Sequence, residues 1–136
     1  MVTLTADKRL LHADLAGGET IRAASGSMVA YTGNVEFKHA GMGGGGGFKA
    51  ALKQKVSGES IKLMECSGSG RVTFAQDAMD VTVIDLTGDT LAVESEHILA
   101  VSGGLTLDVK FAGLQGMTSG QGLATTTVTG QGQVAI

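Results

Sequence analysis

The sequence predicts an all-β fold, in which two internally repeated units form a two-sheet structure with at most one short helix. Stretches in which apolar and polar residues alternate run through the chain, and this period of two is typical of strands. Glycine-containing turn signals separate the stretches at the spacing seen in β-sandwiches and barrels. Because the chain has 22 glycines and no proline, glycine is expected to make the turns. The clearest signals are Gly17-Gly18, Gly33-Asn34, Gly88-Asp89 and Gly103-Gly104.

The third observation is that residues 10–39 are similar to residues 81–111. The matching segments are Asp14-Leu15 with Asp85-Leu86, Glu19-Thr20 with Asp89-Thr90, Met28-Val29-Ala30 with Ile98-Leu99-Ala100, and Gly68–Val72 with Gly130–Val134. Self-similarity at such a period indicates one supersecondary unit that is present twice. We therefore predict a single domain over residues 1–136, with unit 1 at about 9–76 and unit 2 at about 79–136.

The individual strands follow from short patterns along the chain. Met28–Tyr31 and Ile98–Val101 are apolar at every position, which predicts strands that are buried on both faces. Alternation marks Asn34–Lys38, Arg71–Phe74 and, most clearly, Leu105–Phe111, and the β-branched run Thr125–Val128 also favours a strand. About a dozen short strands are expected in all.

One segment departs from the β pattern. In Phe48–Val56 the apolar residues fall at helical spacing, and the segment follows the glycine run Gly41–Gly47, which we interpret as a flexible connector. Lys49 and Lys53 would share a helix face with apolar residues opposite, so the segment is weakly amphipathic. The structural interpretation of this segment is the solvated face of a short helix, and the functional hypothesis is contact with a protein partner or a membrane surface. The candidate contact residues are Phe48, Lys49, Leu52, Lys53 and Lys55.

The residue patterns argue against catalysis, and we expect no enzyme and no cofactor. A phosphate-binding loop needs lysine directly after its last glycine and then a hydroxyl, but Phe48 and Ala50 break that pattern. His12, His39 and His97 lack the spacing that places two ligands on one face, so no metal site is predicted. His97, which corresponds to Ser27, is expected to be hydrogen-bonded and partly buried.

The acidic residues that precede the glycine turns have a structural interpretation. Asp14, Glu19, Asp85 and Asp89 match in pairs between the two units, and side-chain bonds to the turn backbone would explain them without chemistry. The single cysteine, Cys66, excludes an internal disulfide and is expected to be a small buried hydrophobe.

Composition limits the partners. The net charge of −3, one tyrosine and no tryptophan argue against nucleic-acid binding, because phosphate neutralisation and base stacking both supply affinity. The first residues lack the apolar core of a secretory signal, and no apolar stretch is long enough to span a membrane. We therefore expect a cytoplasmic protein.

The linked pattern resembles the altered-inheritance-of-mitochondria protein family of bacteria and fungi. The resemblance covers nearly the whole chain and rests on the order and spacing of four segments. These are GGETIRAASGSMVAYTGNVEF, FKAALKQKVSGESIKLMECSGSGRVTFA after the glycine run, IDLTGDTLAVESEHILAVSGGLTLD, and GLATTTVTGQGQVAI. The family shares its fold with the tryptophan RNA-binding attenuation protein (TRAP) and offers no catalytic residues to carry over.

The resemblance implies a TRAP-like shortened double-stranded β-helix, made of sheets packed face to face and often assembled into symmetric oligomers. In fungi the family is tied to mitochondrial inner-membrane organisation, and its bacterial members are largely of unknown role. Longer members continue into a third unit beyond the equivalent of Ile136, so a partner subunit is expected to cover what that unit would cover.

These expectations lead to two functional hypotheses. The first is a non-enzymatic scaffold that self-assembles into a trimer or ring and contacts a protein or membrane through its glycine-rich loop. The alternative is a small-ligand or RNA-binding module, by analogy with the TRAP fold.

Overall fold

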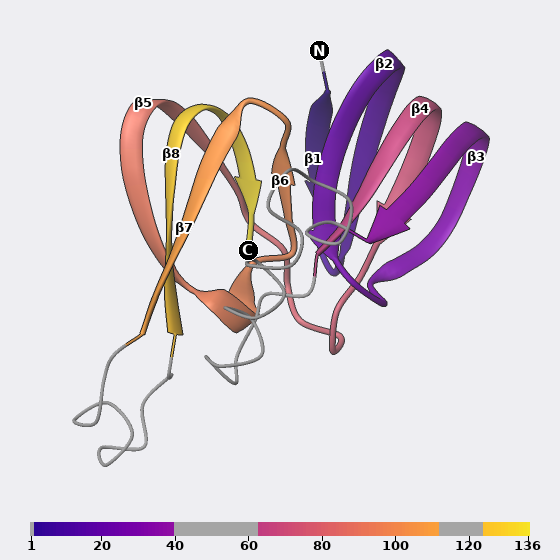
Figure 1. The fold of residues 1–136 in the computed structure, drawn as a ribbon. Helices are drawn as coiled ribbons and strands as arrows, with labels where there is room; N and C mark the ends of the chain where they lie inside the picture. The colour runs from indigo at the N-terminus through magenta and orange to yellow at the C-terminus, as the bar shows by residue number, and fades with distance from the viewer. Residues whose placement is uncertain (1, 40–62, 112–123) are drawn as a thin grey trace.

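The computed structural model describes residues 2–39, 63–111 and 124–136 of the chain, and in these residues it is all-β, as predicted. The described residues form eight strands and one 3₁₀ turn, with no α-helix (Figure 1). The strands are β1 (Thr3–Asp7), β2 (Leu10–Ala24), β3 (Met28–His39), β4 (Leu63–Phe74), β5 (Val83–Glu94), β6 (Ala100–Ser102), β7 (Leu105–Phe111) and β8 (Ala124–Ala135), and the 3₁₀ turn η1 is Ser95–His97. None of these residues belongs to a helix that is long and apolar enough to cross a membrane.

All strand pairs of the described sheet are antiparallel. The order is β3-β4-β2-β6-β8-β5, with β1 paired to β2 and β7 paired to β8. Figure 1 shows two nested sets of strands, which we call the N-terminal stack (β1–β4) and the C-terminal stack (β5–β8). The short strand β6 belongs to the second stack but also pairs with β2 of the first, so it joins the two.

The long strands are arched. Five strands in the described residues are 12 to 15 residues long. Figure 1 shows that each of them bends into an arch, so that its two halves lie in different layers. In the described residues the strands are fewer and longer than the dozen short strands expected, because most of the glycine signals lie inside continuous strands rather than between strands. Glycine bends the backbone there while strand pairing continues on either side. Positive-φ glycines inside the strands are Gly17, Gly18, Gly33, Gly68, Gly70, Gly88, Gly130 and Gly132.

Two glycines of β4 also permit a close approach of β3. A Cβ atom at Gly68 would lie 2.1 Å from the carbonyl oxygen of Asn34, and one at Gly70 would lie 2.0 Å from that of Thr32. The obstacles are backbone atoms of the paired strand, which cannot move without breaking the ladder. A side chain is therefore excluded at both positions.

Each stack encloses an apolar core. The first cluster contains Val2, Leu4, Leu11, Ala13, Leu15, Ile21, Ala23, Cys66, Val72, Phe74, Leu99, Ala100 and Ala135. The second contains Leu86, Val93, Ile98, Val101, Leu105, Val128 and Val134. The first cluster includes Leu99, which directly precedes β6, and Ala100, the first residue of β6, so residues of the C-terminal stack complete part of the core of the N-terminal stack.

Along β3, β6 and β7 the strand registers repeat at constant sequence offsets. In the N-terminal stack Val35 of β3 pairs with Gly68 of β4, and in the C-terminal stack Leu105 of β7 pairs with Gly130 of β8. The same offsets, 70 and 62 residues, convert the Tyr31–Val72 pair into Val101–Val134, which joins β6 to β8. The single strand β3 is therefore equivalent to β6 followed by β7.

Candidate functional site

The residues predicted to contact a partner lie outside the described part of the chain. Phe48, Lys49, Leu52, Lys53 and Lys55, together with the glycine run before them and the short helix predicted there, fall between residues 40 and 62. That prediction therefore stays a prediction, and the candidate site is built from the strands.

The first feature is the junction between the two stacks. The second half of β2 pairs with β6, with Ile21 opposite Ser102, Arg22 opposite Val101 and Ala23 opposite Ala100. The pairing extends by one hydrogen bond, because the backbone N–H of Ala24 donates to the carbonyl oxygen of Leu99 at 2.8 Å. The two stacks are thus parts of one continuous sheet.

Arg22 strengthens this junction with a charged hydrogen bond. Its guanidinium Nη2 donates to the carbonyl oxygen of Leu105, which starts the first strand after β6. Burial lowers the pKa of this half-buried guanidinium, and the nearby charge of Glu65 opposes that shift. A hydrogen bond from a charged donor is stronger than one between neutral groups, so this contact stabilises the junction.

The equivalent edge of β3 lacks this cover. The sequence predicted that Met28–Tyr31 and Ile98–Val101 are both buried on two faces, and this is correct only for the second segment. Leu99 and Val101 are 3% and 0% exposed, but their equivalents Val29 and Tyr31 are 59% and 48% exposed. The physical reason is strand order, since β6 lies between β2 and β8, whereas β3 pairs with β4 alone among the described residues.

Val29 and Tyr31 are the exposed large apolar residues of β3, and we call the surface around these two side chains the β3 edge. The ring of Tyr31 meets the ring of Phe37 edge to face, with their centroids 5.1 Å apart, because the strand bends between them. Phe37 and Val35 also pack partly against the first core cluster. The β3 edge is therefore continuous with the core of the N-terminal stack and open to solvent at Val29 and Tyr31.

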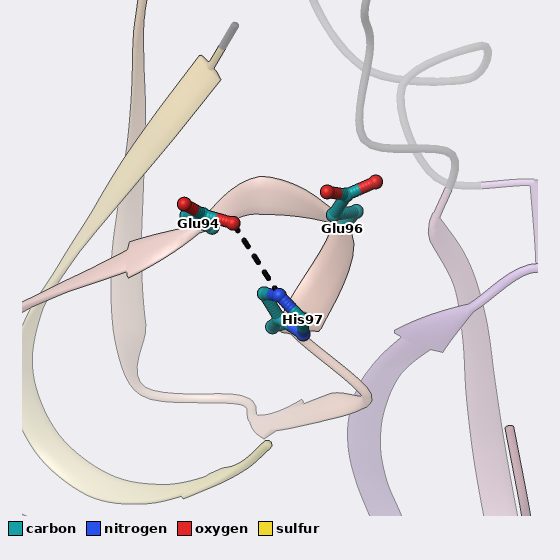
Figure 2. Close-up of side chains that lie close together, drawn as sticks. All are labelled: Glu94, Glu96 and His97. Carbon is teal, nitrogen blue, oxygen red and sulfur yellow. Dashed lines mark ion pairs between the residues drawn. The ribbon is translucent and has the colours of Figure 1, made fainter. Parts of the chain in front are cut away.

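A second feature is a group of possible metal ligands after β5. The ligand atoms of Glu94, Glu96 and His97 all lie within 4.8 Å of one another, and His97 Nε2 is 3.3 Å from a carboxylate oxygen of Glu94 (Figure 2). The Glu-Ser-Glu-His run was a sequence signal for this group that the search for paired histidines missed. All three side chains are exposed, and exposed acidic groups commonly hold no ion, so the group alone does not identify a metal site.

The environment of His97 differs from the prediction. Its side chain is exposed rather than partly buried, although it does have a partner in Glu94. Its counterpart Ser27 is buried and donates its hydroxyl to the carbonyl oxygen of Ala24 at 2.6 Å. Glu96 and His97 line a cleft of about 350 Å³ that also includes Asp77.

Two of the matched acidic residues, Asp14 and Asp85, have side-chain partners on the neighbouring strand. Arg71 donates two hydrogen bonds to Asp14, at 2.8 and 3.1 Å, and Gln133 Nε2 donates to Asp85 at 3.0 Å. The turn role predicted for these two aspartates was therefore wrong. Glu19 does act on the backbone, since its carboxylate accepts a hydrogen bond from the N–H of Ala16. The hydrogen bonds from Arg71 hold the pKa of Asp14 below its usual value.

Two further groups, Cys66 and the His12–Thr73 pair, are of types that can take part in nucleophilic chemistry. Cys66 is buried as predicted, and burial raises the pKa of its thiol to about 11, which disfavours the reactive thiolate. His12 Nδ1 and Thr73 Oγ1 lie 2.9 Å apart as a cross-strand pair of β2 and β4. The His12–Thr73 pair lines neither the cleft beside His97 nor a second cleft, described next, where the two stacks meet.

The larger cleft lies where the two stacks meet and has a volume of about 730 Å³. Its lining comes from the start of the chain, the bends of β2 and β5, the turn after β6, and β8. The polar side chains in it include those of Glu19, Asp85, Ser102 and Gln133.

Comparisons with known proteins identify the family. None of the curated proteins matches the chain. A crystal structure of protein SPYM3_0169 from Streptococcus pyogenes is similar, with 21% sequence identity and a TM-score of 0.39, over 100% of this chain and 92% of that one. A match at this TM-score carries no conclusion about function. The model of the family described as mitochondrial biogenesis AIM24 matches residues 2–136. The chain therefore belongs to the AIM24 family, as its resemblance predicted.

Proposed function

We propose that this protein is a non-enzymatic scaffold whose copies assemble into a closed trimer or ring through the edges of their sheets. The observation that carries the proposal is the exposed apolar β3 edge. The equivalent residues of β6 are buried because another strand covers them, so the β3 edge has the composition of a covered strand without the cover.

General physics supports this function. An exposed strand edge presents unpaired backbone N–H and C=O groups, and symmetric oligomers are a common way to cover such edges. An apolar surface at the same edge adds a hydrophobic contribution to association. We further infer the TRAP-like shortened double-stranded β-helix, which the arched strands and their two-layer arrangement support. Contact of residues 48–55 with a membrane or a protein partner remains part of the hypothesis.

Light scattering coupled to size-exclusion chromatography tests the proposal. We expect wild-type protein to have a mass that is a multiple of 13.7 kDa, and Tyr31→Lys to shift the population toward the single-chain mass. Met79→Lys is the matched control, because Met79 is 52% exposed but belongs to the connection between β4 and β5 rather than to β3. A wild-type protein that remains a single chain at every concentration would overturn the proposal, and so would equal effects of the two substitutions.

The cleft of about 730 Å³ favours the alternative, a small-ligand module, because its volume lies in the range of ligand pockets. Thermal unfolding in the presence of a metabolite panel tests it. A ligand of this cleft should raise Tm for wild-type protein but not for Thr87→Arg, in which a long side chain is added to the exposed lining residue Thr87. Equal stabilisation of both proteins would exclude this cleft as the site.

A further inference from the structure

We propose that copies of this chain join head to tail, with the first half of β3 pairing antiparallel to the second half of β5 of the next copy. The pairing would reproduce, between copies, the β2–β6 junction that joins the stacks within each chain. This inference rests on the proposed self-assembly and specifies the surfaces that carry it.

Both strands of the internal junction have equivalents elsewhere in the chain. By register, β6 is equivalent to the first half of β3, and Leu99 and Val101 correspond to Val29 and Tyr31. The second half of β2 has its equivalent in β5, since Ile21 pairs with Cys66 and Leu91 pairs with Val128 at the same two offsets. The first half of β3 is therefore the equivalent of β6, and the second half of β5 is the equivalent of the second half of β2.

These equivalent strands lie at edges that pair on one side only. Among the described residues, β3 pairs only with β4, and β5 pairs only with β8, so the two ends of the sheet order are β3 and β5. Neither strand contains proline, so every backbone N–H is present to donate. The open edges of β3 and β5 are thus the equivalents of the edges of β6 and β2 that pair with each other inside the chain.

The internal register predicts the register between copies. Ile21 lies opposite Ser102 and Ala23 opposite Ala100, so the same offsets place Leu91 opposite Thr32 of the next copy and Val93 opposite its Ala30. Between these pairs, Ala92 would face Tyr31. Residues directly opposite in an antiparallel pair share one face of the sheet, so their side chains must fit together.

Side-chain volumes fit this register. At the internal junction the long Arg22 lies opposite the smaller Val101, and at the proposed junction the small Ala92 lies opposite the large Tyr31. The segments Val29–Thr32 and Leu91–Val93 contain no charged side chain, so no unpaired charge would be buried between them. Because the two surfaces differ, the contact is heterologous and forms a ring if the rotation between copies closes.

A cysteine pair tests the register. Oxidation of Tyr31→Cys/Ala92→Cys should give a series of disulfide-linked multimers on non-reducing gels, because opposite residues of an antiparallel pair lie within disulfide range. Neither single variant should cross-link with itself, whereas a mixture of the two single variants should give dimers only. Cys66 is buried and adds no accessible thiol.

The matched control is Tyr31→Cys/Thr106→Cys, which places the second thiol on β7. Thr106 is exposed on a strand that, like β5, pairs only with β8 among the described residues, so the control separates the two edges of the C-terminal stack. A second pair, Thr32→Cys/Leu91→Cys, tests the same register one position along if the first double variant does not fold.

The outcomes separate the inference from the function on which it rests. Wild-type protein that is oligomeric by light scattering, with no cross-linking of either double variant, would overturn the β3–β5 pairing and leave self-assembly standing. Cross-linking of Tyr31→Cys alone would indicate a symmetric β3–β3 contact, and cross-linking through Thr106 in place of Ala92 would indicate β7; each overturns the inference. A wild-type single chain would overturn both proposals.

Discussion

The two stacks enclose their cores with equivalent strands, but they differ in how the last strand is covered. In the C-terminal stack β6 lies between β8 and β2, and its apolar residues are buried. In the N-terminal stack the equivalent part of β3 has one neighbour among the described residues, and Val29 and Tyr31 are exposed. Burial of equivalent apolar segments therefore depends on the neighbouring strand, which lies far away in the sequence.

The greatest loss of stability is expected where two strands approach closely at a glycine, and the atoms that face this glycine differ between the two stacks. In Gly70→Ala the new Cβ would lie 2.0 Å from a backbone oxygen of β3, whereas in Gly132→Ala it would lie 2.4 Å from Oγ of Ser102, a side chain that can rotate. We expect Gly70→Ala to lower the free energy of unfolding by about 3 kcal/mol or more, and Gly132→Ala by about 1–2 kcal/mol. Denaturant unfolding of both variants measures this difference, and equal losses would contradict it.

An intermediate effect is expected at the junction between the stacks. Arg22→Met keeps the apolar length of the side chain but removes the charged hydrogen bond to the carbonyl oxygen of Leu105. We expect a loss of about 1–3 kcal/mol in the free energy of unfolding, because the carbonyl oxygen of a buried residue loses its charged donor. Lys110→Met, at an exposed position of β7, is the control and should change stability by less than about 0.5 kcal/mol. A loss in Arg22→Met no larger than the control would show that the guanidinium does not stabilise the junction.

A smaller change in stability is expected from the side-chain pairs that match between the two stacks, Asp14 with Arg71 and Asp85 with Gln133. Asp14 bonds to the cation of Arg71, whereas its equivalent Asp85 bonds to the neutral amide of Gln133. Because the pKa of Asp14 is lowered in the folded protein, its contribution to stability is present above the ordinary carboxyl pKa of about 4 and is lost as the pH falls below it. Arg71→Gln, which recreates the pair of the C-terminal stack, should reduce this acid dependence.

Unfolding midpoints measured from neutral to acidic pH test this prediction. The loss at neutral pH should be smaller than that of Arg22→Met, because both partners of the ion pair are solvent-exposed. An acid dependence that is the same for wild-type protein and Arg71→Gln would contradict the assignment.

Several structural features could be predicted from local patterns. The period of two predicted β structure, the matched segments agree with the repeated strand registers, and the apolar run Ile98–Val101 is buried as expected. The described strands are fewer and longer than predicted because glycine marks a change of direction without showing whether pairing continues through it. At Gly88 the strand continues, whereas at Gly103 and Gly104 it is interrupted.

The candidate interface was less predictable than the fold. Met28–Tyr31 and Ile98–Val101 have the same apolar pattern, so no local property separates the exposed segment from the buried one. The group formed by Glu94, Glu96 and His97 is local in sequence, but its exposure became known only with the position of the turn after β5. The loop residues Phe48–Lys55 remain a sequence-based prediction.

Local sequence patterns are enough to predict β structure, because alternation, β-branched residues and glycine spacing act through neighbouring residues of the chain. The sequence also indicates that two equivalent sets of strands exist, because the same pattern is present twice. The order of the strands in the sheet, in contrast, is set by contacts between distant parts of the chain. The β2–β6 pair joins residues about 80 positions apart, and such a contact depends on the packing of both cores rather than on local preference. That pairing covers one apolar strand and leaves its equivalent as the β3 edge.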